Sequence, residues 1–207
     1  MNRYRTILAP VGAEIEVKRS VFRCQLAPIS DEAAAREVIE QARSEFWDAR
    51  HHCSAFIWQA DGSMARSSDD GEPSGTAGAP MLEVLRGSGL TEVVAVVTRW
   101  FGGTLLGAGG LVRAYSDAVR AGLEAATVRE RELVGEHEVR LDHALAARAE
   151  SALRAGGTSV LGTSYGRDVT MTLGIRDEDL DQVEALLASL SHGGAELVRV
   201  GSRWVDC

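Results

Sequence analysis

Hydrophobic and polar residues follow two different periods along the first part of the chain. Apolar residues occupy alternate positions over 14–18 and again over 20–29, a period-two pattern that predicts two half-buried strands. From Asp31 the apolar spacing changes to three and four residues and continues to Phe46. This spacing predicts an amphipathic helix, and Ser30 is the predicted N-cap.

The next segments continue the alternation of strands and helices. Residues 53–59 and the stretch before Ser67 are predicted strands, and Pro80 suits the first position of a short helix. Residues 91–98 contain an unbroken run of mostly β-branched apolar residues, which predicts a central strand buried on both faces. A helix with one apolar side follows from residue 111.

A charged stretch at 129–132 interrupts the apolar pattern, and we predict a boundary there between two domains, 1–130 and 136–207. Beyond it the pattern predicts strand, helix, strand, strand, helix and strand, an order that matches the ferredoxin-like plan. The predicted fold class is therefore α+β, with an α/β domain followed by a ferredoxin-like βαββαβ domain. The predicted elements of the second domain are 138–141, 144–155, 159–165, 169–175, 177–190 and 196–200.

Composition narrows the classes of function. No apolar run has the length of a membrane span, and no signal-peptide core follows the N-terminus, so we expect a cytoplasmic protein. Cys24, Cys53 and Cys207 are far apart and odd in number, which argues against a disulfide framework and a structural zinc site. The net charge of −8 opposes binding of bulk nucleic acid, although a local basic patch is compatible with it.

Two glycine-rich segments, 66–78 and 98–110, are the most informative part of the sequence. Glycine at this density is costly in backbone entropy, so such loops occur where the backbone turns tightly or approaches another group closely. Both segments lead into predicted helices, whose free N-terminal N–H groups favour anions. The sequence therefore predicts a surface site formed by the two loops.

The candidate binding residues of these loops are acidic, basic, aromatic and glycine residues. The acids would meet basic groups or order the loop, the arginines would meet phosphate or carboxylate, and the aromatic residues would stack a base, anchor a partner or cover the core. For the last arginine, an intrahelical pair with Asp117 is the simpler interpretation. The candidates are Arg66, Asp69, Asp70, Glu72, Arg99, Trp100, Phe101, Gly107, Gly109, Gly110 and Arg113.

Patterns typical of known active sites are incomplete here. The spacing from Gly102 to Gly107 is that of a phosphate-binding loop, but Ala108 stands where the lysine is required. A hydrolase that holds a metal with the carboxylates of residues 69–72, and a sensor that binds an anion or nucleotide at the start of the helix near Gly109, remain alternatives. We predict no catalytic residue, no metal site and no cofactor.

The two motifs resemble those of the YigZ/IMPACT family. The resemblance is carried by the sequences SDDGEPSGTAG at 68–78, TRWFGG at 98–103 and LGAGGLVRAY at 106–115. Trp100 replaces a tyrosine common in the family motif, and Leu106 stands where some relatives carry lysine.

The resemblance implies a first domain like the second domain of ribosomal protein S-five and a second domain like a ferredoxin-like domain of elongation factor G. Eukaryotic relatives regulate translation during amino-acid starvation. It therefore implies a non-enzymatic protein that binds a translation-associated protein, the ribosome or RNA and acts in translation or the stress response. No membrane or DNA partner is expected.

Overall fold

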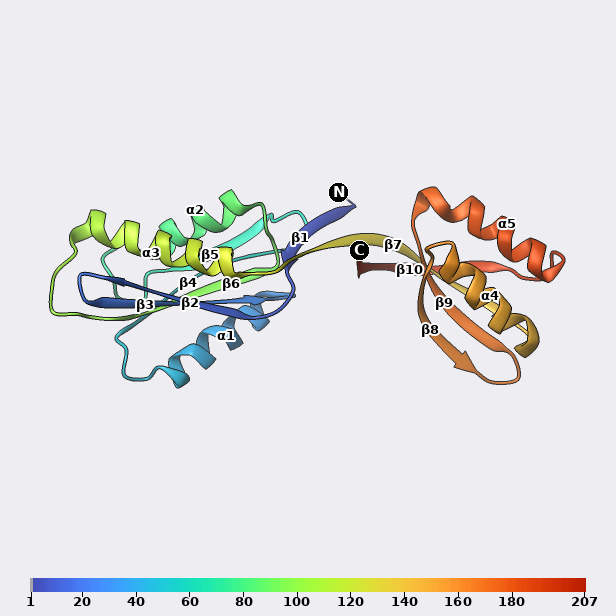
Figure 1. Ribbon diagram of the computed structural model, residues 1–207, viewed down its shortest axis with the longest axis horizontal. Helices are drawn as coiled ribbons and strands as arrows, with labels where there is room; N and C mark the ends of the chain where they lie inside the picture. Colours follow the sequence, from blue (N-terminus) through green and yellow to red (C-terminus); the bar gives the residue numbers. More distant parts are fainter. Residues whose placement is uncertain (1) are drawn as a thin grey trace. The chain divides into compact units, whose positions relative to one another are not determined.

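A computed structural model describes residues 2–207 of the chain, which form two compact units, Arg3–Glu130 and Arg131–Cys207. The fold is mixed α/β (Figure 1). No helix of the described residues is long and apolar enough to cross a membrane.

The first unit contains a five-stranded antiparallel sheet in the order β2-β3-β6-β4-β5. Helix α1 packs on one face of this sheet, and α2 and α3 pack on the other (Figure 1). The elements of this unit are β1 (Arg3–Ile7), β2 (Val11–Val17), β3 (Ser20–Pro28), α1 (Glu32–Glu45), β4 (His51–Trp58), β5 (Met64–Ser68), α2 (Gly78–Ser88), β6 (Val93–Trp100) and α3 (Gly107–Ala125).

Strand β6 is the centre of this sheet, as its run of apolar residues predicted. Val93, Ala95 and Val97 pack toward α2 and α3, whereas Val94 and Val96 pack toward α1. All five side chains are fully buried. The strand therefore supplies both cores of the unit, and its C-terminal end carries the second glycine-rich segment to one end of the sheet.

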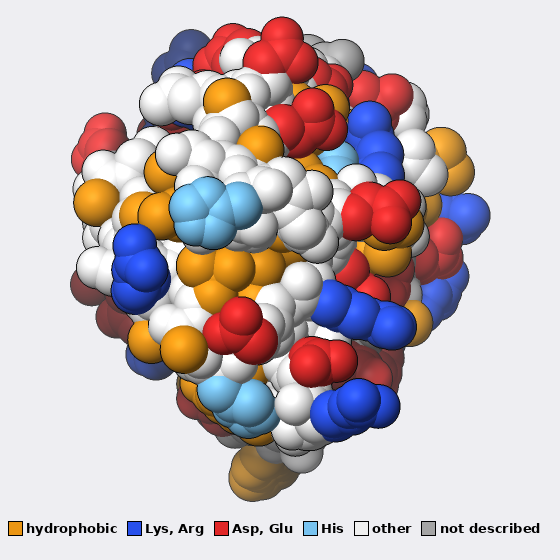
Figure 2. Space-filling model, turned by 90° about the vertical axis from the view of Figure 1, so that its right-hand side faces the viewer, with side chains coloured by type: hydrophobic (Ala, Val, Ile, Leu, Met, Phe, Trp, Pro, Cys, Tyr) orange, Lys and Arg blue, Asp and Glu red, His pale blue; other side chains and the backbone are white. Residues whose placement is uncertain are grey.

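The second unit has the βαββαβ order that the sequence predicted. Its strands lie in the order β10-β7-β9-β8, and α4 and α5 pack on one face of the sheet. On the face drawn in Figure 2, acidic and basic side chains surround a group of hydrophobic ones. The elements are β7 (Val128–Leu141), α4 (His143–Ala155), β8 (Ser159–Tyr165), β9 (Val169–Ile175), the single 3-10 turn η1 (Asp177–Asp179), α5 (Leu180–Ser191) and β10 (Leu197–Asp206).

Three local predictions are corrected by the structure. The charged stretch at 129–132 does not end the strand pattern but lies within β7, where Glu132 faces Val205 of β10. The N-cap of α1 is Asp31 instead of Ser30, because the Asp31 carboxylate accepts a hydrogen bond from the Ala34 N–H at 2.8 Å. Strand β1, which pairs with β7, was not predicted.

The packing of α3 on the sheet depends on the small size of Gly122. A Cβ atom at this position would lie 3.0 Å from the Cys24 sulfur and 3.1 Å from a methyl group of Leu26. Both neighbours are fully buried. Because a close-packed core has little room to yield, a larger residue must displace the helix or the strand.

We expect Gly122→Val to lower the free energy of unfolding by about 1–3 kcal/mol through overpacking. Urea denaturation followed by circular dichroism measures the change. The control is Gly87→Ala on α2, where a Cβ atom would meet nothing within 4 Å and the protein should become slightly more stable. Equal stability of Gly122→Val and the unmodified protein would contradict this account of the packing.

Candidate partner-binding surface

The two glycine-rich segments lie at the same end of the sheet of the first unit. The sheet register places Trp100 opposite Val21, Arg99 opposite His51, and Ser68 opposite Ser54. The C-terminal ends of β5 and β6 therefore meet the N-terminal ends of β3 and β4. We call this end, with segments 66–78 and 98–110, the loop surface (left-hand end of Figure 1).

Asp69 organises the first segment by accepting hydrogen bonds from the backbone. Its carboxylate accepts from the N–H groups of Gly75 at 2.8 Å, Ala77 at 3.0 Å and Gly78 at 2.8 Å. Ala77 is the N-cap of α2 and Gly78 is its first residue, and this N-cap supplies no side-chain acceptor of its own. Partial burial tends to raise the pKa of Asp69, but the donors of Gly75, Gly78 and Ala77 together lower it below its ordinary value.

Asp70 ties the same segment to β4 and α1. Its carboxylate accepts from the His52 backbone N–H at 2.6 Å and from the Arg43 guanidinium at 2.8 Å. Its backbone has a φ of 40°, a left-handed conformation that aspartate tolerates better than most residues. The two adjacent aspartates therefore point to different partners.

Glu72 is buried beneath the loops and joins both segments. Its Oε1 atom accepts from Arg99 Nη1 at 2.6 Å and from the Tyr115 hydroxyl at 2.8 Å. Arg99 ends β6 and Tyr115 lies in α3, and all three residues are at least nine-tenths buried. We call Glu72, Arg99 and Tyr115 the buried triad. It connects the first segment, the second segment and the helix that follows.

Cys53 borders the buried triad and has no base to activate it. Its sulfur lies 3.0 Å from the Asp69 carbonyl oxygen and 3.3 Å from the Tyr115 hydroxyl oxygen. Burial raises the pKa of this thiol to about 12, and the nearby carboxylates add to the rise. The thiol is therefore protonated at neutral pH, which disfavours a role as a nucleophile.

The second segment packs closely on the turn between β2 and β3. A Cβ atom at Gly102 would lie 2.0 Å from the Arg19 backbone, so only glycine fits there. The Gly102 N–H donates to Ser20 Oγ at 3.1 Å, and Arg19 donates to the Thr104 hydroxyl at 3.0 Å. The second segment is therefore fixed against the turn between β2 and β3 at Gly102.

The start of α3 is exposed beyond that point. Gly107 has a φ of 72°, which glycine adopts without strain, and Gly107 and Gly109 are exposed while Gly110 is half-buried. Leu106, the N-cap, supplies no side-chain acceptor to the first N–H groups of the helix. The helix thus begins at Gly107, earlier than the predicted start at residue 111, and an anion at its N-terminus stays a prediction.

The remaining predicted residues are distributed around the loop surface. Arg113 is exposed on α3, and Asp117 pairs with Arg120 at 2.6 Å instead of with Arg113. Trp100 packs edge-to-face on Phe46 on the α1 side of the sheet. Phe101 is 53% exposed, with the Arg99 guanidinium carbon 5.7 Å from its ring centre.

Arg66 is the predicted residue that turns toward α1. Its Nε atom lies 3.1 Å from a carboxylate oxygen of Glu32, near the start of that helix. The structure therefore brings the acids, Arg99 and Phe101 together at the loop surface. Arg66 is held on the α1 side by a different contact.

The carboxylates of residues 69–72 do not converge on a common point. Asp69 is directed to backbone N–H groups, Asp70 to His52 and Arg43, and Glu72 to the buried triad. Among residues 2–207, no group of three or more His, Cys, Asp and Glu side chains has a geometry suited to a metal ion. Each carboxylate in this loop is engaged by the chain's own donors.

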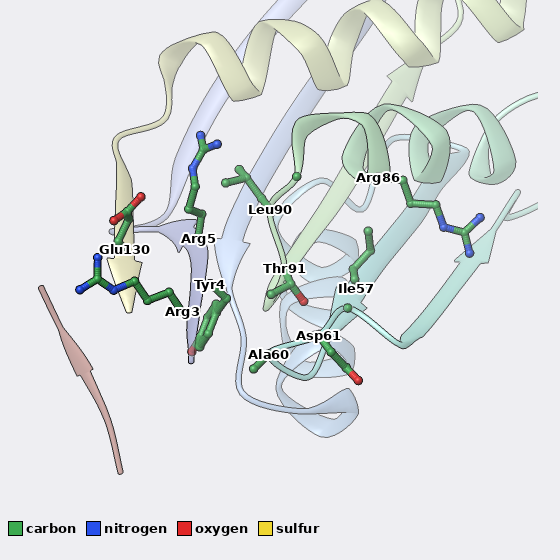
Figure 3. Close-up of a pocket in the computed structure, with 12 residues that line it drawn as sticks. Arg3, Tyr4, Arg5, Ile57, Ala60, Asp61, Arg86, Leu90, Thr91 and Glu130 are labelled. Atoms are coloured by element: carbon green, nitrogen blue, oxygen red, sulfur yellow. The ribbon is translucent and has the colours of Figure 1, made fainter. Parts of the chain in front are cut away.

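A concavity of about 430 Å³ lies elsewhere on the first unit, around Tyr4, Leu90 and the turn at Asp61–Gly62 (Figure 3). Three arginines line it, but their guanidinium groups point in different directions. They do not form a common anion site. This concavity is built from residues outside both glycine-rich segments.

Sequence reasoning missed two parts of the loop surface. Tyr115 was assigned only to the apolar side of its helix, and Cys53 was considered only as a buried thiol, a metal ligand or a nucleophile. In the structure the Tyr115 hydroxyl donates to Glu72, and the Cys53 sulfur contacts that hydroxyl. Trp47, which is 82% exposed, was not singled out. The sequence did contain a signal for this residue. Trp47 comes directly after Phe46, the predicted end of the helix, at a position where folding does not require a tryptophan.

Comparisons with known proteins match both units. Residues 18–123 match the Impact N-terminal domain, and residues 139–193 match a domain of unknown function (DUF1949). The chain is 34% identical over 197 residues to "IMPACT family member YvyE" of Bacillus subtilis (strain 168), covering 95% of this chain and 91% of that protein. It is 36% identical over 194 residues to "IMPACT family member YigZ" of Escherichia coli (strain K12), covering 93% and 95%.

A eukaryotic relative and a solved structure extend these matches. "Protein IMPACT" of Rattus norvegicus is 33% identical over 101 residues, which cover 46% of this chain and 31% of that protein. A crystal structure of a hypothetical protein is 35% identical, with a TM-score of 0.69, and covers 97% of this chain and 98% of its own. The bacterial relatives therefore match over nearly the whole chain.

Glu72→Gln should lower the free energy of unfolding by about 3–5 kcal/mol, because it leaves Arg99 buried without its counter-charge. The matched control is Glu32→Gln, which removes the half-buried partner of Arg66 and should cost at most about 1 kcal/mol. Urea titrations of both variants give the comparison. If the two variants lose the same stability, the buried triad does not hold the loops.

Asp69 should make stability depend on pH in the acid range. Its pKa is lower in the folded protein than in the unfolded chain, so its contribution is complete above the unfolded value of about 3.9 and is lost as the pH falls below it. The stability difference between the unmodified protein and Asp69→Asn should therefore shrink between about pH 5 and pH 3. Thermal melts across this range measure it, and a constant difference would contradict the assigned role.

Proposed function

Because the chain belongs to the IMPACT family, we propose that it is a non-catalytic cytoplasmic protein that binds a component of the translation machinery through the loop surface and so regulates translation. The family's resemblance to translation regulators gives the biological setting. The loop surface lies within residues 18–123, the part of the chain that matches the Impact N-terminal domain.

The observation that carries the proposal is that the motif carboxylates point inward, to donors of this chain. Asp69, Asp70 and Glu72 each accept hydrogen bonds from groups of this chain. A catalytic carboxylate must reach a substrate atom or hold a metal or a proton for it. Carboxylates that are engaged by internal donors instead fix the shape of the loops, which suits recognition.

The groups left facing solvent are those of a binding surface. Arg113 and Phe101 are exposed beside the start of α3, and Leu105 is 83% exposed. Arginine and aromatic residues provide much of the binding energy at interfaces. The uncapped N–H groups of the α3 start would donate hydrogen bonds to a phosphate or carboxylate of the partner.

Cosedimentation with purified ribosomes through a sucrose cushion tests this function. We expect the unmodified protein to pellet with ribosomes and Arg113→Glu to weaken the association about tenfold, which is the effect of losing one charge-assisted contact. The matched control is Arg86→Glu, a charge reversal of an exposed arginine on α2 that lies outside the loop surface.

The outcome of this pair of variants decides the proposal. Retained association of Arg86→Glu with loss for Arg113→Glu supports the loop surface as the contact. Absence of the unmodified protein from the ribosome pellet at low salt, or equal effects of both substitutions, would overturn it.

A further inference from the structure

Two aromatic rings pack together where α1 ends beside the end of β6, and a third aromatic residue, Trp47, follows one of them in the chain. The Phe46 and Trp100 rings pack edge-to-face with 5.5 Å between their centres, and both side chains are half-buried. Asp48 accepts a hydrogen bond from the Trp100 indole N–H at 3.0 Å. Trp47 lies between these two contacts in the chain and is 82% exposed. We call Phe46, Trp47 and Trp100 the aromatic cluster.

Folding does not account for the exposure of Trp47. A buried tryptophan contributes through the large apolar area that it removes from water, and Trp47 removes little. An exposed indole next in the chain to an aromatic pair is instead suited to a binding surface. The neighbouring contacts of residues 46 and 48 with Trp100 fix the backbone on both sides of Trp47.

Arginines accompany the aromatic cluster. The Arg23 guanidinium carbon lies 5.0 Å from the Phe46 ring centre, and this side chain is 42% exposed. Arg50 is exposed, and no hydrogen bond or ion pair is found for it among the described residues. The acids nearby are Asp48, which is bound to Trp100, Glu14, whose carboxylate oxygen lies 3.9 Å from Arg23, and the exposed Glu45, which accepts from Gln25 at 3.5 Å.

Charge at this end of the unit differs from the charge of the whole chain. The carboxylates of residues 69, 70 and 72 are turned inward onto the chain's own donors. Lys18, Arg19, Arg50 and Arg113 are exposed at the same end. The excess of acidic residues lies mainly in the second unit. The loop surface therefore exposes lysine and arginine side chains to solvent, although the net charge of the whole chain is −8.

The exposed indole of Trp47, the partly exposed Arg23 and the exposed Arg50 together match the chemistry of single-stranded RNA. Unpaired bases stack on aromatic side chains, while phosphates are contacted by arginine and lysine. A duplex hides its base faces and would use only the cations. With few cations available, stacking must provide most of the affinity, so the dependence on salt should be shallow.

We propose that the aromatic cluster binds single-stranded RNA, with bases stacked on Trp47 and Trp100 and phosphates contacted by Arg23 and Arg50. This inference rests on the proposed function and gives the class of ligand for its surface. The aromatic cluster lies on the α1 side of the sheet, so the proposed RNA site extends beyond the glycine-rich loops that the motifs identify.

Fluorescence anisotropy with a labelled single-stranded oligouridylate tests the proposal, with an RNA duplex as the comparison ligand. Trp47→Ala should weaken binding about fivefold to a hundredfold, the range for one lost base stack, and Trp47→Phe should restore most of it. Because Trp47 is exposed, the variant should fold, and a thermal melt verifies this. The matched control is Tyr165→Ala, which removes a 74% exposed aromatic residue of the second unit and should leave binding unchanged.

Salt titration separates the phosphate contacts from stacking. Arg50→Gln should reduce the slope of log affinity against log salt by about 0.7, the value for one phosphate contact to a single strand. Trp47→Ala should lower affinity and leave the slope unchanged. A duplex bound as tightly as the single strand, or equal losses for Trp47→Ala and Tyr165→Ala, would overturn the assignment.

The outcomes distinguish this inference from the proposed function. If the oligouridylate does not bind while the unmodified protein still pellets with ribosomes, the RNA assignment fails and the proposed function stands. If Trp47→Ala abolishes ribosome association without any RNA binding by the unmodified protein, the cluster contacts a protein, which also overturns the RNA assignment. RNA binding without ribosome association would instead overturn the proposed function.

Discussion

The contact between Glu72, Arg99 and Tyr115 is the constraint on which the loop surface depends. It joins a loop, a strand end and a helix that are far apart in the sequence, and it does so out of water. Burying two charges is costly unless their hydrogen-bonding groups are well satisfied, so the pair is weak evidence of net stabilisation. Its effect is on geometry, because the two glycine-rich segments cannot separate without leaving a buried charge unpartnered.

The same contacts decide the electrostatic character of this end of the molecule. In the sequence, three neighbouring acidic residues indicate a negatively charged loop. In the structure, the Asp69 carboxylate accepts hydrogen bonds from the backbone at the start of α2, and the Asp70 carboxylate accepts from His52 and Arg43. Their charge is neutralised locally, whereas the exposed lysine and arginines remain available. An acidic chain can therefore present a surface suited to anions.

Patterns that depend on near neighbours were predicted well from the sequence. Strands β8 and β9 begin and end where the alternating pattern placed them, and β6 is buried on both faces as its composition indicated. The failures involve distant partners. Arg131 and Glu132 lie within β7, where Asp206 and Val205 of β10 pair with them from the far end of the sequence. Strand β1 likewise depends on β7, more than a hundred residues away in the sequence.

The sequence by itself determined the two-unit α/β architecture, the family and the positions of the glycine-rich loops. These follow from hydrophobic period, motif spacing and the backbone freedom of glycine, which are properties of residues close together in the chain. Only the tertiary structure decided that Glu72 meets Arg99 and Tyr115, that the motif carboxylates turn inward, and that Trp47 stays exposed. The physical reason is that burial and charge pairing depend on which distant segments the sheet brings together, and local spacing does not specify that choice.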